Sequence, residues 1–267
     1  MNRPIGVIDS GVGGLTVARE LMRQLPKEKL IYVGDTLRCP YGPRPKEEVI
    51  QFTREMVDFL LEKNIKMLVI ACNTATAFTL EMLRNELDIP VVGVIQPGAR
   101  AAIKTSQNQH IGVIGTEGTI SSQAYPQALK HINPSIHVND LACPRFVPLV
   151  EMGVLEGEDA YQVVAESLVP MKEQNHIDTL ILGCTHYPLL SSTIQEVMGN
   201  DIKIISSGDE TAREVSVLLE YYDTFSNGYH PPQHEFYATG DRALFENIAN
   251  AWFDSPVEHI EIITLGT

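Results

Sequence analysis

The 267-residue chain has no apolar run approaching the roughly 20 residues that a membrane-spanning helix needs. There is also no room for a secretory signal peptide, because Met1–Ile5 leads directly into an expected strand. Basic residues are few, with 20 Lys and Arg against 34 Asp and Glu and a net charge of −14. A nucleic-acid partner would need a basic face. We therefore expect a cytoplasmic protein with no membrane and no nucleic-acid partner.

Closely spaced cysteines are missing as well. The four cysteines are Cys39, Cys72, Cys143 and Cys184, and none lies two to four residues from another. Because zinc fingers and ribbons need such spacing, we expect no metal site. A reducing cytosol disfavours disulfides, so Cys39 and Cys143 are interpreted as small buried apolar residues.

Nucleotide-binding glycine motifs are absent too. The expected first strand, residues 5–8, is followed by Asp9-Ser10-Gly11-Val12-Gly13-Gly14. A dinucleotide fingerprint would need glycine at Thr16, and a P-loop would need a Gly-Lys-Ser/Thr ending. We expect no nucleotide here. The glycines instead let the backbone turn sharply and approach a small ligand.

Two short stretches carry the strongest positive signal. Residues 69–74 and 180–186 are each an apolar run that stops at a cysteine, Cys72 or Cys184, before a helical segment. This pattern is typical of a buried parallel strand followed by a helix, and Asn73 and Thr74 are expected to cap the first of these helices. Open α/β sheets bind ligands at this strand-to-helix edge, so both thiols are candidate site residues.

The two halves of the chain resemble each other. The matching landmarks, in the same order, are Gly6 and Gly112, Cys39-Pro40 and Cys143-Pro144, and Cys72 and Cys184. They predict two related α/β units, residues 1–97 with 207–267 and residues 98–206. A break is expected at Gln96-Pro97-Gly98, and after the strand at 202–205 the chain is expected to return to the first unit at residue 207.

Two thiols that face one carbon can invert it without a cofactor. A thiolate removes a proton from one face while a neutral thiol donates a proton to the other. Unperturbed cysteine has a pKa of about 8.5, so each thiol can serve as acid or base. Asp9 and His186 could relay protons to Cys72 and Cys184, respectively, and Glu151 is a third candidate.

Other interpretations of these residues stay open at this point. A cysteine at a strand end also fits a thiol-nucleophile hydrolase, in which one cysteine would suffice. His186 could be an ordinary helix-turn residue. The paired cysteines at equivalent sites favour proton transfer over acyl transfer.

The chain resembles the glutamate racemases of the aspartate/glutamate racemase family, which supply D-glutamate for bacterial peptidoglycan. The similarity runs from residue 5 to about residue 210, and its motifs are Val7–Gly14, Pro40-Tyr41-Gly42, Ala71–Thr76 and Leu182–Pro188. The resemblance implies two pseudo-symmetric α/β domains with parallel, Rossmann-like sheets and an active site in the cleft between them. It also implies that Cys72 removes the α-proton of D-glutamate and Cys184 that of L-glutamate.

The resemblance further implies a set of substrate contacts and the absence of any metal, pyridoxal phosphate or nucleotide cofactor. The expected substrate-binding residues are Asp9, Ser10, Tyr41, Gly42, Asn73, Thr74, Thr116, Thr185 and His186. The expected partner is glutamate itself, and a homodimer is left open. The alternatives are a related aspartate or hydantoin racemase, or a module that binds a small acid without converting it.

Overall fold

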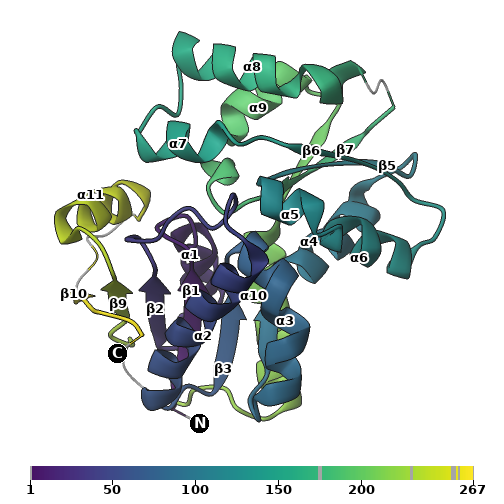
Figure 1. The fold of residues 1–267 in the computed structure, drawn as a ribbon. Helices are drawn as coiled ribbons and strands as arrows, with labels where there is room; N and C mark the ends of the chain where they lie inside the picture. The colour runs from purple at the N-terminus through teal and green to yellow at the C-terminus, as the bar shows by residue number, and fades with distance from the viewer. Residues whose placement is uncertain (1, 174–175, 229–230, 254–256, 258, 267) are drawn as a thin grey trace. The chain divides into compact units, whose positions relative to one another are not determined.

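The computed structural model describes residues 2–173, 176–228, 231–253, 257 and 259–266 (Figure 1). The chain divides into two compact units, unit 1 with residues 1–94 and 208–267, and unit 2 with residues 95–207. The expected break at Gln96-Pro97-Gly98 is wrong, because helix α4 (Ile95–Thr105) runs through it. Pro97 lies in the first turn, where the main-chain N–H has no partner within the helix, so proline is tolerated.

Unit 1 is built on a six-stranded sheet in the described residues, with parallel pairing between all neighbours and the order β10-β9-β2-β1-β3-β4. The strands are β1 (Ile5–Asp9), β2 (Leu30–Gly34), β3 (Met67–Ile70), β4 (Val91–Gly93), β9 (Glu235–Ala238) and β10 (Ile260–Ile262). The helices are α1 (Leu15–Gln24), α2 (Lys46–Glu62), α3 (Asn73–Glu86), α10 (Ser207–Tyr221) and α11 (Arg242–Trp252).

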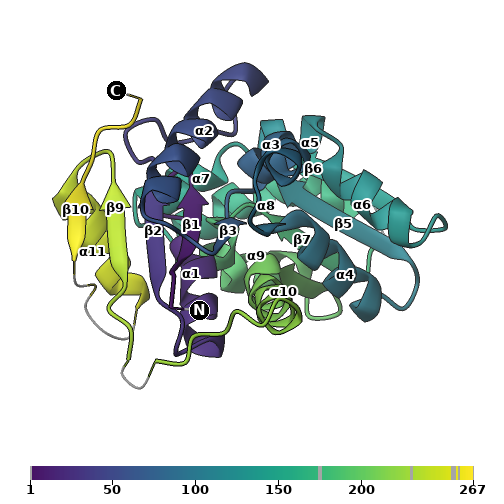
Figure 2. The same cartoon turned by 90° about the horizontal axis from the view of Figure 1, so that it is seen from below.

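Both faces of this sheet are covered, which explains its continuous apolar strands. Ile5 and Val7 belong to the core formed with α1, α10 and α11, whereas Ile8 belongs to the core formed with α2 and α3. Figure 2 shows α2 on one side of the strands and α1, α10 and α11 on the other. The alternation of side chains along each strand therefore divides the apolar residues between two helical layers.

Unit 2 repeats this plan with a four-stranded parallel sheet in the order β6-β5-β7-β8. The strands are β5 (His110–Gly115), β6 (His137–Ala142), β7 (Thr179–Gly183) and β8 (Lys203–Ser206). Besides α4, the helices are α5 (Glu117–Ser121), α6 (Ala124–Ile132), α7 (Phe146–Glu151), α8 (Glu158–Glu173), the 3-10 helix η1 (Tyr187–Leu190) and α9 (Ser191–Met198). Figure 1 shows α8 and α9 on one face of this sheet and α4 and α6 on the other.

The strand at 203–206 completes the sheet of unit 2. β8 pairs with β7 of unit 2, so the chain returns to unit 1 only at Gly208. Among the described residues, no helix combines the length and the hydropathy needed to cross a membrane.

The strand that leads to Cys72 is fixed at its start by a buried ion pair. The Nζ of Lys66 lies 2.6 Å from Oε2 of Glu28, and both side chains are 1% exposed. The same Nζ donates a hydrogen bond to the carbonyl oxygen of Thr224 at 2.6 Å. Because a buried charge is costly unless it is paired, these contacts hold the beginning of β3 in place.

The registers of the two sheets place the cysteines at equivalent positions. In each unit one leucine pairs with the glycine of the central strand, β1 or β5. Leu68 does so four residues before Cys72, and Leu180 does so four residues before Cys184. The sequence repeat that relates these two cysteines is therefore confirmed in the structure.

The Cys-Pro landmarks do not match in the same way. Ile31 of β2 and Asn139 of β6 occupy equivalent positions, since each pairs with that central glycine. Cys143 lies four residues after Asn139, whereas Cys39 lies eight residues after Ile31. The residue equivalent to Cys143 is Asp35. The shared dipeptide is therefore not a shared position.

Candidate active site

Cys72 is itself the cap of helix α3. Its backbone is extended, with φ −64° and ψ 123°, and its Sγ accepts a hydrogen bond from the N–H of Ala75 at 3.4 Å. The expectation that Asn73 and Thr74 cap this helix is wrong, because both lie in its first turn. An acceptor at this position meets the positive end of the helix dipole, which favours the thiolate. The side chain is buried, with 5% exposure.

Asp9 and Ser10 lie at the end of β1, the strand beside β3. The buried carboxylate of Asp9 accepts a hydrogen bond from the N–H of Gly11 at 3.0 Å, and the Tyr32 hydroxyl donates to the carbonyl oxygen of Gly11 at 2.7 Å. A Cβ at Gly14 would lie 2.4 Å from the Cβ of Asp9, so only glycine fits there. Burial raises the pKa of Tyr32, and the negative charge of Asp9 raises it further. Tyr32 therefore stays a neutral donor.

In unit 2, Cys184 follows β7 directly. The polar group beside its sulfur is a side chain, whereas the sulfur of Cys72 accepts a hydrogen bond from a main-chain N–H at the start of a helix. The Sγ of Cys184 lies 3.9 Å from Nδ1 of His186, and both residues are buried. Nε2 of His186 lies 3.4 Å from Oε1 of Glu151, which is 36% exposed. The three side chains form a row from the thiol to a carboxylate that reaches the surface. Such a row can carry a proton in either direction.

The other groups around Cys184 are held neutral. Burial raises the pKa of Tyr187 and of Tyr125, and a charge on Cys184 raises both further. Burial also raises the pKa of the Cys143 thiol to about 12. Cys143 is buried, as expected. Cys39, for which burial was also expected, is only half-buried.

The remaining candidate residues lie at the same strand ends. Four of them are buried: Ser10, Asn73, Thr74 and Thr185. Thr116 is the N-cap of α5, and its Oγ1 accepts from the N–H of Thr119 at 3.3 Å. Within unit 1 the structure gathers Asp9, Ser10, Cys72, Asn73 and Thr74 at the carboxyl ends of two paired strands. Within unit 2 it gathers Thr116, Cys184, Thr185 and His186 in the same way, with Glu151 beside His186. Their contacts with substrate stay predictions.

Tyr41 is placed differently from what a substrate-binding hydroxyl would require. Its side chain is fully buried, and its hydroxyl donates a hydrogen bond to Asp35. Gly42 is buried as well, and contacts of Tyr41 and Gly42 with substrate stay predictions. Asp35 was not among the residues selected from the sequence. The signal that marks it is the one that marks Asp9, a carboxylate directly after a buried strand.

Comparison with known proteins decides the family. The family model described as Asp/Glu/hydantoin racemase matches residues 5–215. The chain belongs to this racemase family. It is accordingly an enzyme of the isomerase class, and the family resemblance and the α/β fold with two parallel sheets are both confirmed.

Individual members of the family match over nearly the whole chain. A glutamate racemase of Oceanobacillus iheyensis is 64% identical over 99% of this chain and 96% of that protein. A solved glutamate racemase isoform of Bacillus anthracis is 48% identical, with a TM-score of 0.92 over 98% of this chain and 97% of that one. A glutamate racemase of Francisella tularensis, solved with D-glutamate, is 34% identical, with a TM-score of 0.92 and 98% of both chains covered.

Proposed function

We propose that the protein interconverts L-glutamate and D-glutamate by proton transfer at the α-carbon, with Cys72 and Cys184 as the two bases. The observation that carries the proposal is the equivalent register of the two thiols, each just beyond a buried parallel strand. Racemisation by two bases needs one acid/base group on each face of one carbon. Glutamate is proposed as the substrate because the matched relatives are glutamate racemases, one of them solved with D-glutamate.

In the proposed reaction the Cys72 thiolate removes the α-proton of D-glutamate, and the Cys184 thiol then donates a proton to the opposite face. The roles reverse for L-glutamate. Each sulfur should lie about 3–3.5 Å from the α-carbon in the reactive complex. Afterwards, His186 and Glu151 restore the charge state of Cys184, and Asp9 does so for Cys72. No metal, pyridoxal phosphate or nucleotide takes part in this scheme.

Substrate binding is proposed to rest on hydroxyl, amide and main-chain groups rather than on cations. Ser10, Asn73 and Thr74 come from unit 1, and Thr116 and Thr185 come from unit 2. In a chain with a net charge of −14, the start of α3 can supply positive potential for a carboxylate. The D-glutamate formed would serve peptidoglycan synthesis in the cytoplasm. Assembly as a homodimer stays a prediction.

The test is racemisation in deuterated water. We expect purified enzyme, incubated with L-glutamate, to form D-glutamate that carries deuterium at the α-carbon. At low conversion the remaining L-glutamate should keep its hydrogen, because the base that removes the proton is not the acid that supplies the new one. Product without solvent deuterium would contradict the mechanism. Inversion of L-aspartate but not of L-glutamate would contradict the substrate assignment.

A further inference from the structure

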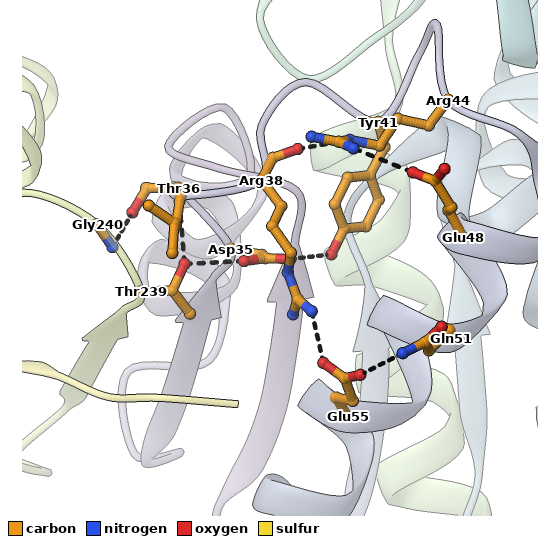
Figure 3. A network of polar contacts seen from close by, with 11 residues as sticks. Asp35, Thr36, Arg38, Tyr41, Arg44, Glu48, Gln51, Glu55, Thr239 and Gly240 are labelled. Atoms are coloured by element: carbon orange, nitrogen blue, oxygen red, sulfur yellow. Dashed lines mark hydrogen bonds and ion pairs between the residues drawn. The ribbon is translucent and has the colours of Figure 1, made fainter. Parts of the chain in front are cut away.

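A buried carboxylate that the proposed mechanism does not use, Asp35, directly follows strand β2. The N–H of Asp35 donates to the carbonyl oxygen of Asp9 at 3.0 Å, and its side chain is 0% exposed. Oδ2 accepts hydrogen bonds from the Tyr41 hydroxyl and from Nε of Arg38, the latter at 2.6 Å, and Oδ1 accepts from Oγ1 of Thr239 at 2.8 Å (Figure 3). Both carboxylate oxygens are therefore engaged, as a buried charge requires.

Arg38 connects this carboxylate to helix α2. Its Nη1 lies 2.5 Å from Oε2 of Glu55, whose Oε1 accepts from Nε2 of Gln51 at 3.0 Å. The guanidinium group lies 4.0 Å from the ring centre of Phe52. Burial alone would lower the pKa of Arg38, but Glu55 and Asp35 outweigh it and the pKa is raised. The positive charge that balances Asp35 is thus held by contacts with helix α2.

Tyr41 links the same carboxylate to the loop over residues 36–45. Its ring is buried against Phe52, with 5.8 Å between ring centres, and the N–H of Arg44 donates to its carbonyl oxygen at 3.1 Å. Burial raises the pKa of Tyr41, and the charge of Asp35 raises it further, so its hydroxyl remains a donor. Figure 3 shows the hydroxyl pointing inward to Asp35, away from Arg44. The hydrogen bond from Tyr41 to Asp35 therefore anchors the loop to the protein interior at the residue before Gly42.

We infer that Asp35 is a positioning residue for substrate binding: by accepting the Tyr41 hydroxyl, it holds the main chain of Tyr41 and Gly42 where a substrate carboxylate binds. Tyr41 then acts through its backbone, and its hydroxyl acts on the loop rather than on the substrate. The inference rests on the proposed function, because it assigns the origin of affinity within that site. It adds Asp35, Arg38 and Thr239 to the residues on which glutamate binding depends.

The variant Tyr41→Phe removes the hydroxyl and keeps the ring. We expect KM for both enantiomers of glutamate to rise about tenfold, equivalent to about 1.4 kcal/mol, with kcat within about twofold of the wild type. A loss of binding that is equal in ground state and transition state raises KM and spares kcat. Asp35→Asn should shift KM in the same direction and further, because it removes the charge that Arg38 balances.

Tyr237→Phe is the matched control in the same unit. Tyr237 is also buried, and its hydroxyl donates to Glu235 at 2.7 Å and accepts from Lys63 at 3.2 Å, outside the 36–45 loop. KM should be unchanged in this variant, and the midpoint of thermal unfolding, measured for every variant, reports any general loss of stability. If the wild-type enzyme is active and the KM of Tyr41→Phe is unchanged, the inference is overturned. A fall in kcat at constant KM would also overturn it. Absence of D-glutamate from the wild type would instead overturn the proposed function.

Discussion

The two strand-edge thiols occupy the same position in their sheets but differ in what surrounds them. Sγ of Cys72 accepts a hydrogen bond from a main-chain N–H, that of Ala75, at 3.4 Å. Sγ of Cys184 lies 3.9 Å from the ring nitrogen of His186, with Glu151 beyond it. The repeated backbone therefore determines where each sulfur lies, whereas local residues determine which polar group lies next to it. Two equivalent strand ends can thus hold thiols in different surroundings.

The next strand edge shows the same contrast. Asp35 follows β2 and Cys143 occupies the equivalent place after β6, both fully buried. A buried tyrosine hydroxyl is bound at each edge, but Tyr41 donates to the carboxylate of Asp35 and Tyr187 donates to the main-chain oxygen of Cys143 at 2.9 Å. In unit 1 the hydrogen bond of Tyr41 connects the 36–45 loop to the carboxylate of Asp35. In unit 2 the hydrogen bond of Tyr187 connects the start of η1 to the main chain of Cys143.

The largest expected effect is the loss of either strand-edge thiol. If both units contribute one base, Cys72→Ala and Cys184→Ala should each lower kcat by about a thousandfold or more, since one general acid/base group contributes about 10²–10⁴-fold. The rate of D-glutamate formation, followed by circular dichroism, measures this. The matched control is Cys143→Ala, which removes a buried thiol whose pKa of about 12 keeps it protonated. Near-normal turnover in Cys72→Ala or in Cys184→Ala would contradict the proposal that each unit contributes one base.

Because the two sulfurs have different polar neighbours, we expect a smaller effect that differs between the two directions of the reaction. Because the enantiomers of glutamate are equally stable, kcat/KM must be equal in both directions, so isotope effects are the informative measurement. If His186 serves Cys184 as proposed, His186→Asn should slow proton transfer at that thiol. It should raise the deuterium isotope effect on kcat/KM for α-deuterated L-glutamate and lower it for α-deuterated D-glutamate. Asp9→Asn should do the reverse through Cys72. We expect each variant to lower kcat/KM by about 10–100-fold.

Equal changes of both isotope effects in His186→Asn would show that this histidine does not serve one thiol alone. Glu151→Gln tests the same row one residue further out. It should shift the isotope effects in the direction of His186→Asn and by less, because the Glu151 side chain is 36% exposed and water screens its charge. A Glu151→Gln shift in the direction of Asp9→Asn would contradict the assignment of Glu151 to the Cys184 side.

The residues that the sequence predicts well are those whose signal is local. An apolar run that ends in a cysteine indicates a strand end, and this placed Cys72 and Cys184 correctly. Pro97 misled because a proline interrupts a helix only beyond its first turn. The repeated Cys-Pro dipeptide misled because a shared dipeptide does not fix the register of a strand.

Asp35 could not be recognised from its neighbours in the sequence. Its hydrogen-bond partners are Arg38 and Tyr41 in the following loop and Thr239, which comes more than 200 residues later. The capping of α3 by Cys72 was missed for a different reason. A thiol is a weak acceptor, so propensity favoured Asn73, whereas the end of β3 determines where the helix begins.

The smallest predicted effect distinguishes the two units by their response to acid. Burial and the positive charge of Lys29 lower the pKa of His234 in unit 1, where its Nδ1 accepts from the N–H of Leu30 at 3.2 Å. In unit 2, burial opposes ionisation of Asp178, but hydrogen bonds from Ser106 and from the main chain of Asn108 lower its pKa. Folding therefore favours the neutral form of His234 and the charged form of Asp178.

The sign of each shift sets a different pH window. Below about pH 6.5 the unfolded chain takes up a proton that His234 resists in the folded state, so the stability contributed around β2 falls as the pH falls. The contribution of Asp178 is complete above about pH 3.9 and is lost only as the pH falls through the lower folded pKa. Acidification from pH 7.5 to 5.5 should thus weaken unit 1 first.

Hydrogen exchange, corrected for the intrinsic pH dependence, measures the difference. The Leu30 amide should lose protection between pH 7.5 and 5.5, because protonation of Nδ1 removes its acceptor, while amides of β7 keep theirs. In His234→Gln a side-chain oxygen can accept the same hydrogen bond and does not titrate, so Leu30 should lose less protection over this range. Equal losses in the wild type and in His234→Gln would mean that another group sets the acid response of unit 1. Earlier loss in β7 would reverse the order of the two units.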